Sequence, residues 1–451
     1  MAPPAGTTGT ELSRRQRIYA FALVTSLFFT WGFSYGLLDV LNAHFQTVFG
    51  ISKLQSTLLQ LAYFGAYFVW APFAGTFMSR IGYKKGIHIG LGLYSLGAVF
   101  FWPSAKFEKY GGFVGSTFVI GCGLATLEVA ANSYISVLGT PKYAAARLNF
   151  SQGFQGVASF SGPLIAARWF FTGANANSLG TVQWVYLAVS GLGVVLNILF
   201  LWIISFAELP EIISATPAED LSGEHESFWK QYHCLFGWVA QTAYVGAQVG
   251  VAAFAVNYFE DQGVGISASR ASDLFSFCQI TFTVGRFVGV VVLNFIDPAF
   301  LLACYGGFCT LFCILVSQLP GYGGVACLFL LFFFESICYP CIFTLGTKNL
   351  GIHTKRGSGL IVMGVGGGAW YPPAQGALAD KADTRRSYLV PMSGYIAMTM
   401  YAVGLVIHQA TKDGFTIRNR NVQVDTHSPA EVLRRDSTEK QTANDELLKS
   451  T

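Results

Sequence analysis

Two acidic residues lie inside long apolar stretches of this chain. Asp39 belongs to the stretch 18–42, and Glu128 belongs to the stretch 113–138. A carboxylate in the hydrocarbon core of a bilayer costs at least about 2.5 kcal/mol, so such an acid is rarely kept without a function. The usual functions are proton carriage and the binding of a polar solute, and both need an acid that faces water. We therefore predict that both acids couple proton movement and that Glu128 also binds the solute.

The first apolar stretch carries polar and aromatic side chains on one helix face, because they recur at steps of four, four and three residues: Trp31, Tyr35, Asp39 and Asn42. Asn132 lies one turn beyond Glu128. Such a face is unsuited to lipid and suited to a water-filled cavity that binds a hydroxylated solute. An alternative stays open for Asp39. A straight helix from Ile18 places it about 31 Å along the axis, near the far interface of the bilayer, where an acid costs little.

Later stretches add further candidate substrate-binding side chains: Gln152, Gln155, Gln241, Gln248, Glu335 and Trp370. Amide and carboxyl groups offer donors and acceptors that match the hydroxyl groups of a solute. The structural alternative is that an amide only bonds a neighbouring helix, at about 0.6 kcal/mol each. Arg286 and Glu335 raise a similar alternative, because they can pair with each other instead of contacting a substrate.

The composition indicates which elements must hold these residues. The chain has 451 residues, of which 53% are hydrophobic and 12% are charged, whereas a soluble domain carries about 25% charged residues. A membrane span needs about 20 mainly apolar residues. We predict an all-α membrane protein with twelve transmembrane helices, at 18–42, 54–78, 86–104, 113–138, 148–170, 181–207, 233–258, 271–293, 298–318, 323–347, 357–379 and 387–409.

The longest polar connection, 208–232, follows the sixth stretch and divides the chain into two six-helix bundles, 18–207 and 233–409. The flanking segments 1–17 and 410–451 are polar, and we expect them to be disordered. Lys and Arg favour the connections on the side of the N-terminus, which is typical of the cytosolic side. We therefore expect a multi-pass protein of the plasma membrane, with both termini and the connection 208–232 in the cytosol, in contact with the lipid bilayer and monomeric.

Several classes of function are not supported by the sequence. The net charge of +4 and the lack of a basic patch argue against a nucleic-acid partner. The nine cysteines lie in apolar stretches and are odd in number, which is not a disulfide framework. Cys338 and Cys341 form a CxxC pair without a histidine or a second pair, so we expect no metal site. No catalytic triad spacing or phosphate-binding loop is present, so we do not expect an enzyme or a bound cofactor, apart from a co-transported proton.

The connection between the second and third stretches contains a short turn followed by basic residues: Gly75, Arg80, Gly82, Lys84 and Lys85. This pattern resembles the signature of the major facilitator superfamily, with Ser79 where that superfamily usually has Asp. The resemblance implies two bundles around a central cavity and a cytosolic gate formed by these residues. The alternative is an ordinary basic loop on the cytosolic side.

Other segments are similar to the fucose permease family, the fucose–galactose–glucose:proton symporters. They are Trp31–Phe33 followed by Asp39, Arg80–Gly86, Leu127–Asn132, Arg147–Asn149 with Gln152, and Thr354–Gly359 continued through Gly366–Ala369 to Pro372 and Pro373. The resemblance covers about residues 20–410. It implies that Asp39 and Glu128 correspond to the two essential carboxylates of the family and that Gln152 and Gln155 face the sugar. This chain departs from the family at Leu38 and Glu335, where relatives have Asn.

Together these observations predict proton-coupled uptake of a monosaccharide, L-fucose or a related hexose such as galactose or glucose, by alternating access. A sugar has many hydroxyl groups and no charge, so amides, carboxyls and aromatic faces suit it. A proton that crosses with the membrane potential supplies about 2.3 kcal/mol per 100 mV. Two alternatives remain open: a proton-coupled exporter of a small metabolite, and a sugar sensor that binds without transport.

Overall fold

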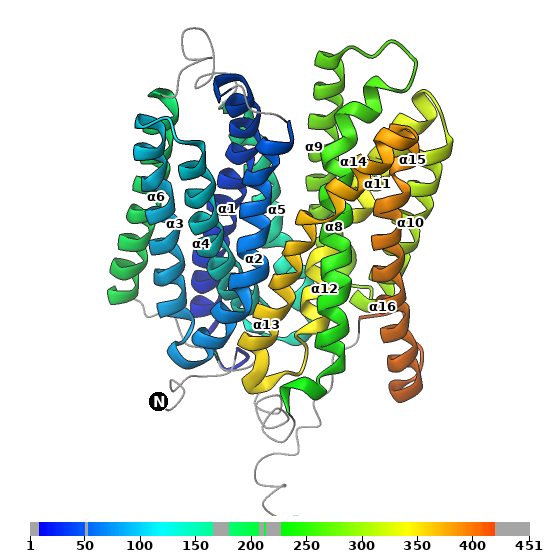
Figure 1. Cartoon of the computed structure of the whole chain (residues 1–451). Coiled ribbons are helices and arrows are strands. Elements are labelled where there is room, and N and C mark those ends of the chain that lie inside the picture. Colours follow the sequence, from blue (N-terminus) through cyan, green and yellow to red (C-terminus); the bar gives the residue numbers. More distant parts are fainter. Residues whose placement is uncertain (1–8, 50–52, 166–179, 207–211, 213–226, 420–451) are drawn as a thin grey trace, which may run out of the picture. The chain divides into compact units, whose positions relative to one another are not determined.

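The computed structural model describes residues 9–49, 53–165, 180–206, 212 and 227–419, and these residues form helices without a β-strand (Figure 1). The side chains of 34–48, 53–57, 162–165, 180–181, 202–206, 268–269 and 413 lie outside this description. Of the predicted disordered segments 1–17 and 410–451, residues 1–8 and 420–451 also lie outside it, as does most of the predicted connection 208–232.

The first half of the chain forms six long helices: α1 (Arg14–Phe49), α2 (Lys53–Ile81), α3 (Tyr83–Lys106), α4 (Tyr110–Val137), α5 (Ala144–Ile165) and α6 (Gly180–Phe206). α3 packs against α4 and α6, α1 packs against α5, and α2 packs against α4. The backbone of α1 begins at Arg14, four residues before the predicted start at Ile18. Its preceding residue Ser13 exchanges hydrogen bonds with Gln16, as in a helix N-terminal cap.

The second half contains more and shorter helices: α8 (Tyr232–Glu260), α9 (Ala268–Leu293), α10 (Pro298–Gln318), α11 (Tyr322–Glu335), α12 (Cys338–Gly346), α13 (Thr354–Met363), α14 (Tyr371–Lys381), α15 (Thr384–Ser387) and α16 (Leu389–Asp413). α8 and α10 both pack against α16. Three-residue 3₁₀-helices cover Pro141–Tyr143, Phe228–Lys230 and Gly351–His353.

Two predicted spans of the second half are broken. The span 323–347 divides into α11 and α12 at Glu335–Cys338, and the span 357–379 divides into α13 and α14 around the 3₁₀-helix η6 (Gly364–Ala369). At η6 the backbone touches α8, because a Cβ on Gly367 would lie 2.0 Å from the Thr242 carbonyl oxygen. Irregular backbone is tolerated at membrane depth where it is buried in protein or lines a cavity. Within the described residues, nine helical segments are long and apolar enough to cross a membrane, and one of them, Tyr322–Gly346, includes the division between α11 and α12.

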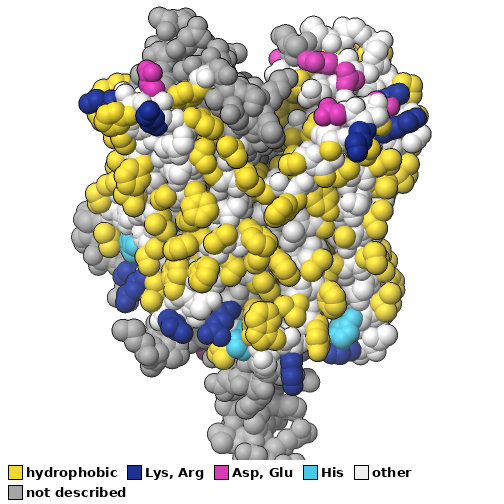
Figure 2. Space-filling model, viewed as in Figure 1, with side chains coloured by type: hydrophobic (Ala, Val, Ile, Leu, Met, Phe, Trp, Pro, Cys, Tyr) yellow, Lys and Arg dark blue, Asp and Glu magenta, His cyan; other side chains and the backbone are white. Residues whose placement is uncertain are grey.

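The surface agrees with a membrane location. Figure 2 shows hydrophobic side chains over the middle of the visible face and charged side chains gathered toward its two ends. Many large apolar side chains are exposed, including Phe73, Val239 and Val291 at 51–61% exposure. Because lipid tails are as apolar as these side chains, such exposure is stable in a bilayer and costly in water. The chain is therefore an all-α membrane protein of the predicted twelve-span class, with some spans divided.

The two halves touch on the side where α1 begins and α16 ends, which we call the terminal side (Figure 1). There α13 packs against α2 and α4, and α5 packs against α9 and α12. A Cβ on Gly75 of α2 would lie 2.9 Å from Cα of Gly359 and 2.5 Å from the carbonyl oxygen of Lys355. The two backbones meet there with no room for a side chain, so the terminal side is closed in this structure.

The chain beyond α16 is placed as far as Asn419, although the sequence predicts a disordered tail from 410. Gly414 has φ +77°, which lets the chain turn sharply after the helix. The carbonyl of Ile417 then accepts a hydrogen bond from the Asp297 amide at 2.9 Å, and the Asn419 amide donates to the Phe295 carbonyl at 2.9 Å. These backbone bonds account for the order of the segment.

Candidate functional site

A cavity of about 480 Å³ lies between the two halves. Its polar lining includes two acids, one arginine and four amides: Glu128, Glu335, Arg286, Gln152, Gln155, Gln248 and Gln279. Aromatic rings complete the lining, among them Trp31, Phe64 and Tyr339. This volume and this mixture of apolar walls with a few polar groups are typical of small-molecule sites.

The helices place the cavity toward the side opposite the termini, which we call the far side. α8 starts on the terminal side and contributes Gln248, Val249 and Ala252 from its second half. α9 runs back from the far side and contributes Ser272 and Ser276 from its first half. The lining therefore extends from the middle of the bundle toward the far side, while the terminal side is closed.

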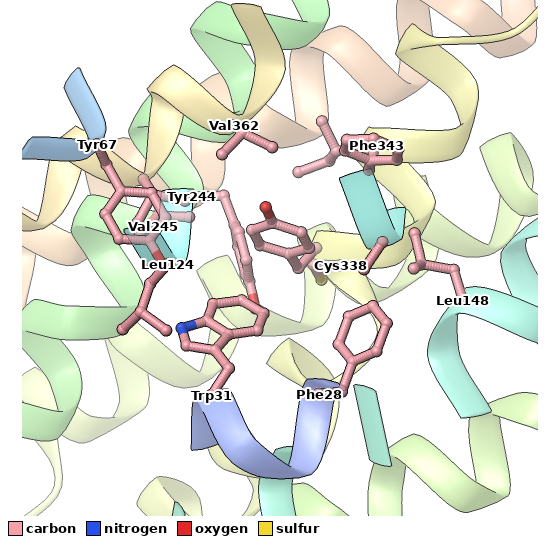
Figure 3. Packing of buried hydrophobic residues seen from close by; sticks show 14 of the residues in the cluster. Phe28, Trp31, Tyr67, Leu124, Leu148, Tyr244, Val245, Cys338, Phe343 and Val362 are labelled. Carbon is pink, nitrogen blue, oxygen red and sulfur yellow. The ribbon is translucent and has the colours of Figure 1, made fainter. Parts of the chain in front are cut away.

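An apolar cluster to which both halves contribute adjoins the cavity, because Trp31 and Val245 belong to both. Figure 3 shows Trp31 of α1 within this cluster, together with Tyr67 and Leu124 from the first half and Tyr244, Val245 and Phe343 from the second. The Trp31 indole donates to the Tyr63 hydroxyl at 3.1 Å, and the Tyr63 and Tyr67 hydroxyls lie 3.4 Å apart. The indole N–H therefore already has a hydrogen-bond partner within the protein, so only the apolar ring of Trp31 is available to contact a solute.

Glu128 is buried at 1% exposure and lines the cavity from α4. The Tyr339 hydroxyl of α12 donates a hydrogen bond to Glu128 Oε1, so this contact joins the two halves. Asn132 Nδ2 lies 3.3 Å from the same oxygen and 3.4 Å from the Tyr339 hydroxyl. Asn132 thus supports the acid and the tyrosine, and it is not itself among the residues that line the cavity. A buried acid that is held by neutral donors at the wall of a cavity is a group that can bind or release a proton.

Arg286 of α9 is buried at 5% exposure and lines the same cavity as the two acids. Its Nε donates to the Ser336 carbonyl at 3.3 Å, and its Nη1 donates to the Gln152 carbonyl and to Gln155 Oε1, the latter at 3.2 Å. The guanidinium carbon also lies 4.7 Å from the centre of the Phe282 ring. Among the described residues no carboxylate lies within ion-pair distance of Arg286, so the alternative of a direct Arg286–Glu335 pair is not what the structure contains.

Glu335 ends α11 and faces the cavity from the second half, at 1% exposure. Its Oε2 accepts a hydrogen bond from the Tyr395 hydroxyl of α16 at 2.5 Å, and its backbone carbonyl accepts one from the Tyr244 hydroxyl at 2.8 Å. The break between α11 and α12 follows directly, and it frees the Ser336 carbonyl that Arg286 binds. Each half therefore contributes one acid that a tyrosine hydroxyl holds.

Gln152 of α5 is the clearest candidate for direct contact with a solute. It is buried at 1% exposure and lines the cavity, yet neither its amide nitrogen nor its amide oxygen has a hydrogen-bond partner. Burying a polar group without a hydrogen-bond partner costs about 1–3 kcal/mol of stability. We therefore expect this amide to bind a ligand or water in the cavity. Gln155 also lines the cavity, where its oxygen accepts from Arg286.

Other predicted residues are placed away from the cavity or outside the description. Gln241 is fully buried with an unpaired amide, but it is not among the residues that line the cavity in this structure. Trp370 lies beside η6 at 64% exposure and does not line it either. The backbone of α1 includes Tyr35, Asp39 and Asn42, and their side chains lie outside the described residues.

The predicted gate lies on the closed terminal side. Gly75 makes the close approach to α13, and Gly82 has φ +87° at the turn between α2 and α3. Arg80 and Lys85 are exposed and Lys84 is half-buried. Ser79, which replaces the usual acid, donates to the Thr76 carbonyl at 2.7 Å within its own helix. The ammonium group of Lys355 of α13 lies 4.3 Å from the centre of the Tyr83 ring. The sequence did not predict this contact. An attraction of this kind can replace an ion pair.

The structure also adds tyrosines to the site that sequence reasoning did not select. Tyr63 lines the cavity from α2, and Tyr395 holds Glu335 from α16. Tyr63 could have been selected from the sequence, because it lies one helical turn from Tyr67. Tyr395 could not, because nothing near it in the sequence indicates a contact with an acid sixty residues earlier. No group of three or more His, Cys, Asp or Glu able to hold a metal occurs in the described part of the chain.

Comparison with known proteins places this architecture in a family. The family model described as Major Facilitator Superfamily matches residues 20–372. The glucose/galactose transporter of Brucella abortus biovar 1 (strain 9-941) is 34% identical over 396 residues, which cover 86% of this chain and 95% of the relative. The L-fucose-proton symporter of Escherichia coli (strain K12) is 30% identical over 412 residues, which cover 86% of this chain and 92% of the relative.

Solved structures agree with this placement. A crystal structure of the Escherichia coli fucose:proton symporter aligns with a TM-score of 0.75 at 30% identity, covering 86% of this chain and 99% of the other. A structure of the same transporter described as being in the outward conformation also has a TM-score of 0.75. A proton:xylose symporter aligns at 0.68 with 13% identity, which is a likeness of fold alone. The chain therefore belongs to the Major Facilitator Superfamily and, within it, to the family that contains the L-fucose–proton symporter and the glucose/galactose transporters.

Proposed function

We propose that this protein takes up a monosaccharide, L-fucose or a related hexose such as galactose or glucose, together with a proton by alternating access. The observation that carries the proposal is the cavity itself. It joins an unpaired amide, Gln152, to a buried acid, Glu128, that a tyrosine of the other half holds. An amide and a carboxyl match neighbouring sugar hydroxyls, and the acid can carry the proton. The names of the relatives, glucose/galactose transporter and L-fucose-proton symporter, favour the same class of substrate.

The terminal side is assigned to the cytosol, which puts both termini there and the cavity on the outer side of a plasma membrane. The cytosolic side is then closed by α13 against α2, and the cavity is the binding site of an outward-facing state. Similarity to a transporter structure described as being in the outward conformation supports this assignment. We take the monomer of two bundles, 18–207 and 233–409, as the working unit, with no cofactor besides the transported proton.

The proton and the sugar act on the same groups. While the cavity is open, water solvates an ionised Glu128. When the halves close around a sugar, that water is lost and an unpaired charge becomes costly, so the protonated acid is favoured. Opening to the cytosol restores water and lets the acid release its proton. Gln152 and Gln155 bind sugar hydroxyls, and Gln248 is placed to contact the sugar from the other half. Asp39 on α1 is proposed as the second proton-coupling acid, with Tyr35 and Asn42 on the same helix face.

The test is uptake of labelled sugars by the purified full-length protein in proteoliposomes, driven by an imposed inward proton gradient. We expect accumulation of one monosaccharide above its outside concentration, abolished by a protonophore. A panel of competing unlabelled sugars then ranks L-fucose, galactose and glucose. Sugar binding without any flux would contradict transport, and proton-driven efflux without uptake would contradict the direction.

A further inference from the structure

The cavity holds one more acid than a simple proton site needs. Glu128 and Glu335 line it from opposite halves, and Arg286 of α9 lines it as well. Arginine stays protonated in proteins, so its positive charge is fixed. Each carboxyl is held by a tyrosine hydroxyl, and among the described residues neither forms an ion pair with Arg286. Both acids are therefore free to change their protonation state while Arg286 keeps its charge.

The other titratable groups near Glu335 are neutral in ordinary conditions. The groups that face it from the surrounding helices, besides Arg286, are Tyr244 of α8, Cys278 of α9, Cys309 and Cys313 of α10, and Tyr388 and Tyr395 at α16. Phenols and thiols carry no charge near pH 7. The net charge of this region is thus decided by the two carboxyls and the guanidinium.

A count of charges gives the consequence. With both acids ionised, the described side chains of the cavity carry one net negative charge, which water can solvate while the cavity is open. With one proton bound to either acid, the net charge is zero. Removing water from a net charge is far more costly than removing it from a neutral set. The neutral set is therefore the one that can close.

We propose that Glu335 makes the proton obligatory. It supplies the second negative charge, so that the cavity must take one proton from the outer water onto a carboxylate oxygen before it can close, and must return it to the cytosolic water on reopening. Without the Glu335 charge, ionised Glu128 would balance Arg286 and the cavity could close with sugar and no proton. This inference rests on the proposed function and adds to it the group that fixes the coupling.

The test compares proton-to-sugar coupling in the wild type and in Glu335→Gln. Proteoliposomes at zero membrane potential receive a series of pH gradients, and the final ratio of inside to outside sugar is measured. One coupled proton allows about tenfold accumulation for each pH unit. We expect the slope of the logarithm of this ratio against the pH gradient to fall by one in Glu335→Gln. Acids elsewhere, Asp39 included, contribute equally to both proteins and cancel in the difference.

Two further variants separate charge from structure. Glu335→Asp keeps the charge and should keep the wild-type slope. Arg286→Gln removes the positive charge, so a neutral cavity needs two protons, and the slope should rise by one in protein that still binds sugar. An unchanged slope in Glu335→Gln, or a fall in Glu335→Asp equal to that in Glu335→Gln, would overturn the inference. If Glu335→Gln does not fold, a slope in Arg286→Gln at or below that of the wild type would overturn it.

Failure of the proposed function has a different signature. If the wild type accumulates no sugar in any pH gradient, proton-coupled uptake is wrong as a whole. If the wild type accumulates sugar and Glu335→Gln matches it, only the role of Glu335 is wrong. Sugar exchange in the absence of a gradient, measured on the same vesicles, confirms that each variant is folded and able to move sugar.

Discussion

Two buried glutamines allow a matched test of the sugar site. Gln152 and Gln241 both have amides without a hydrogen-bond partner, but only Gln152 lines the cavity. We expect Gln152→Ala to weaken sugar binding by about 1–3 kcal/mol because a sugar hydroxyl is left unpaired, which is roughly a 5- to 150-fold change in affinity. Gln241→Ala should bind as the wild type does. Equilibrium binding in detergent, with a thermal-stability control, measures both.

The opposite ranking would locate the sugar elsewhere. If Gln241→Ala loses affinity and Gln152→Ala does not, the helix face identified from the sequence was the relevant one and the cavity of this state is not the main site. If affinity in Gln152→Ala falls only in step with stability, that amide holds helices together.

Glu128→Gln tests the acid of the first half. Gln keeps an oxygen that can accept from Tyr339, so the bridge between the halves is retained. It cannot release a proton, and we expect the dependence of uptake on external pH to weaken while sugar exchange continues. The measurement is initial uptake over a range of external pH, with Asn132→Ala as the control because Asn132 touches the acid without lining the cavity. A pH profile in Glu128→Gln like that of the wild type would show that Glu128 carries no transported proton.

Helical periodicity explains which site residues could be predicted from the sequence. Glu128, Gln152 and Gln155 were predicted because a polar group inside an apolar helix must face protein or water, and the structure places them at the cavity. The same reasoning selected Gln241 and Trp370, which lie elsewhere, because periodicity gives the angle between residues of one helix but not the direction in which that helix faces. Tyr395 and Lys355 act through partners far away in the chain, which one sequence does not reveal.

At the scale of whole elements, hydropathy predicted the spans but not their breaks. The division between α11 and α12 falls at Glu335–Cys338, just before Pro340, which has no N–H to bond the Ser336 carbonyl in a continuous helix. It is stabilised from outside, by the bonds of Arg286 and Tyr244 to freed carbonyls. The glycines of η6 are visible in the sequence as a possible helix break. The structure shows why glycine is needed there, because α8 approaches the backbone closely. Local proline and glycine residues and tertiary contacts together therefore decide where these helices end.

The contact between α2 and α13 provides a prediction at this scale. A methyl group on Gly75 would collide with the backbone of α13, whereas one on Gly65 of the same helix meets nothing within 4 Å. We expect Gly75→Ala to weaken the closed terminal side and to shift the population toward states open on that side, and Gly65→Ala to leave it unchanged. Spin labels at the exposed Lys85 and Arg356 measure the separation. Equal distance distributions in both variants would mean that this contact does not hold the side closed.

For the molecule as a whole, the sequence predicted two halves and an approximate orientation but not how the halves meet. The order of apolar stretches and the long central connection are local features, so they can be read along the chain. The arrangement of the halves differs between the states of an alternating-access cycle, and one sequence must encode all of them with small differences in free energy. The closed terminal side and the far-side cavity belong to one of these states.

The segment after α16 ties the two halves in that state. Asn419 Nδ2 donates to the Lys142 carbonyl of the first half and to the Leu293 carbonyl of the second, each at 2.9 Å. Opening the terminal side separates these carbonyls, so at least one bond must break. A hydrogen bond of this kind is worth about 0.5–1.5 kcal/mol net. The segment therefore favours the closed terminal side by a small, adjustable amount.

Asn419→Ala should accordingly raise the fraction of molecules open on the terminal side, by about fivefold for each 1 kcal/mol lost. The same labels at Lys85 and Arg356, measured without sugar, report this fraction. Arg418→Ala is the matched control, because residue 418 pairs with Ile296 through its backbone and its side chain is exposed. Sugar affinity of the outward-facing site should fall in proportion, since fewer molecules present it. If Asn419→Ala and Arg418→Ala give the same distances and the same affinity as the wild type, the segment is a passive end of the chain. An effect confined to Asn419→Ala would mean that the C-terminal segment adjusts the transport cycle through one side-chain amide.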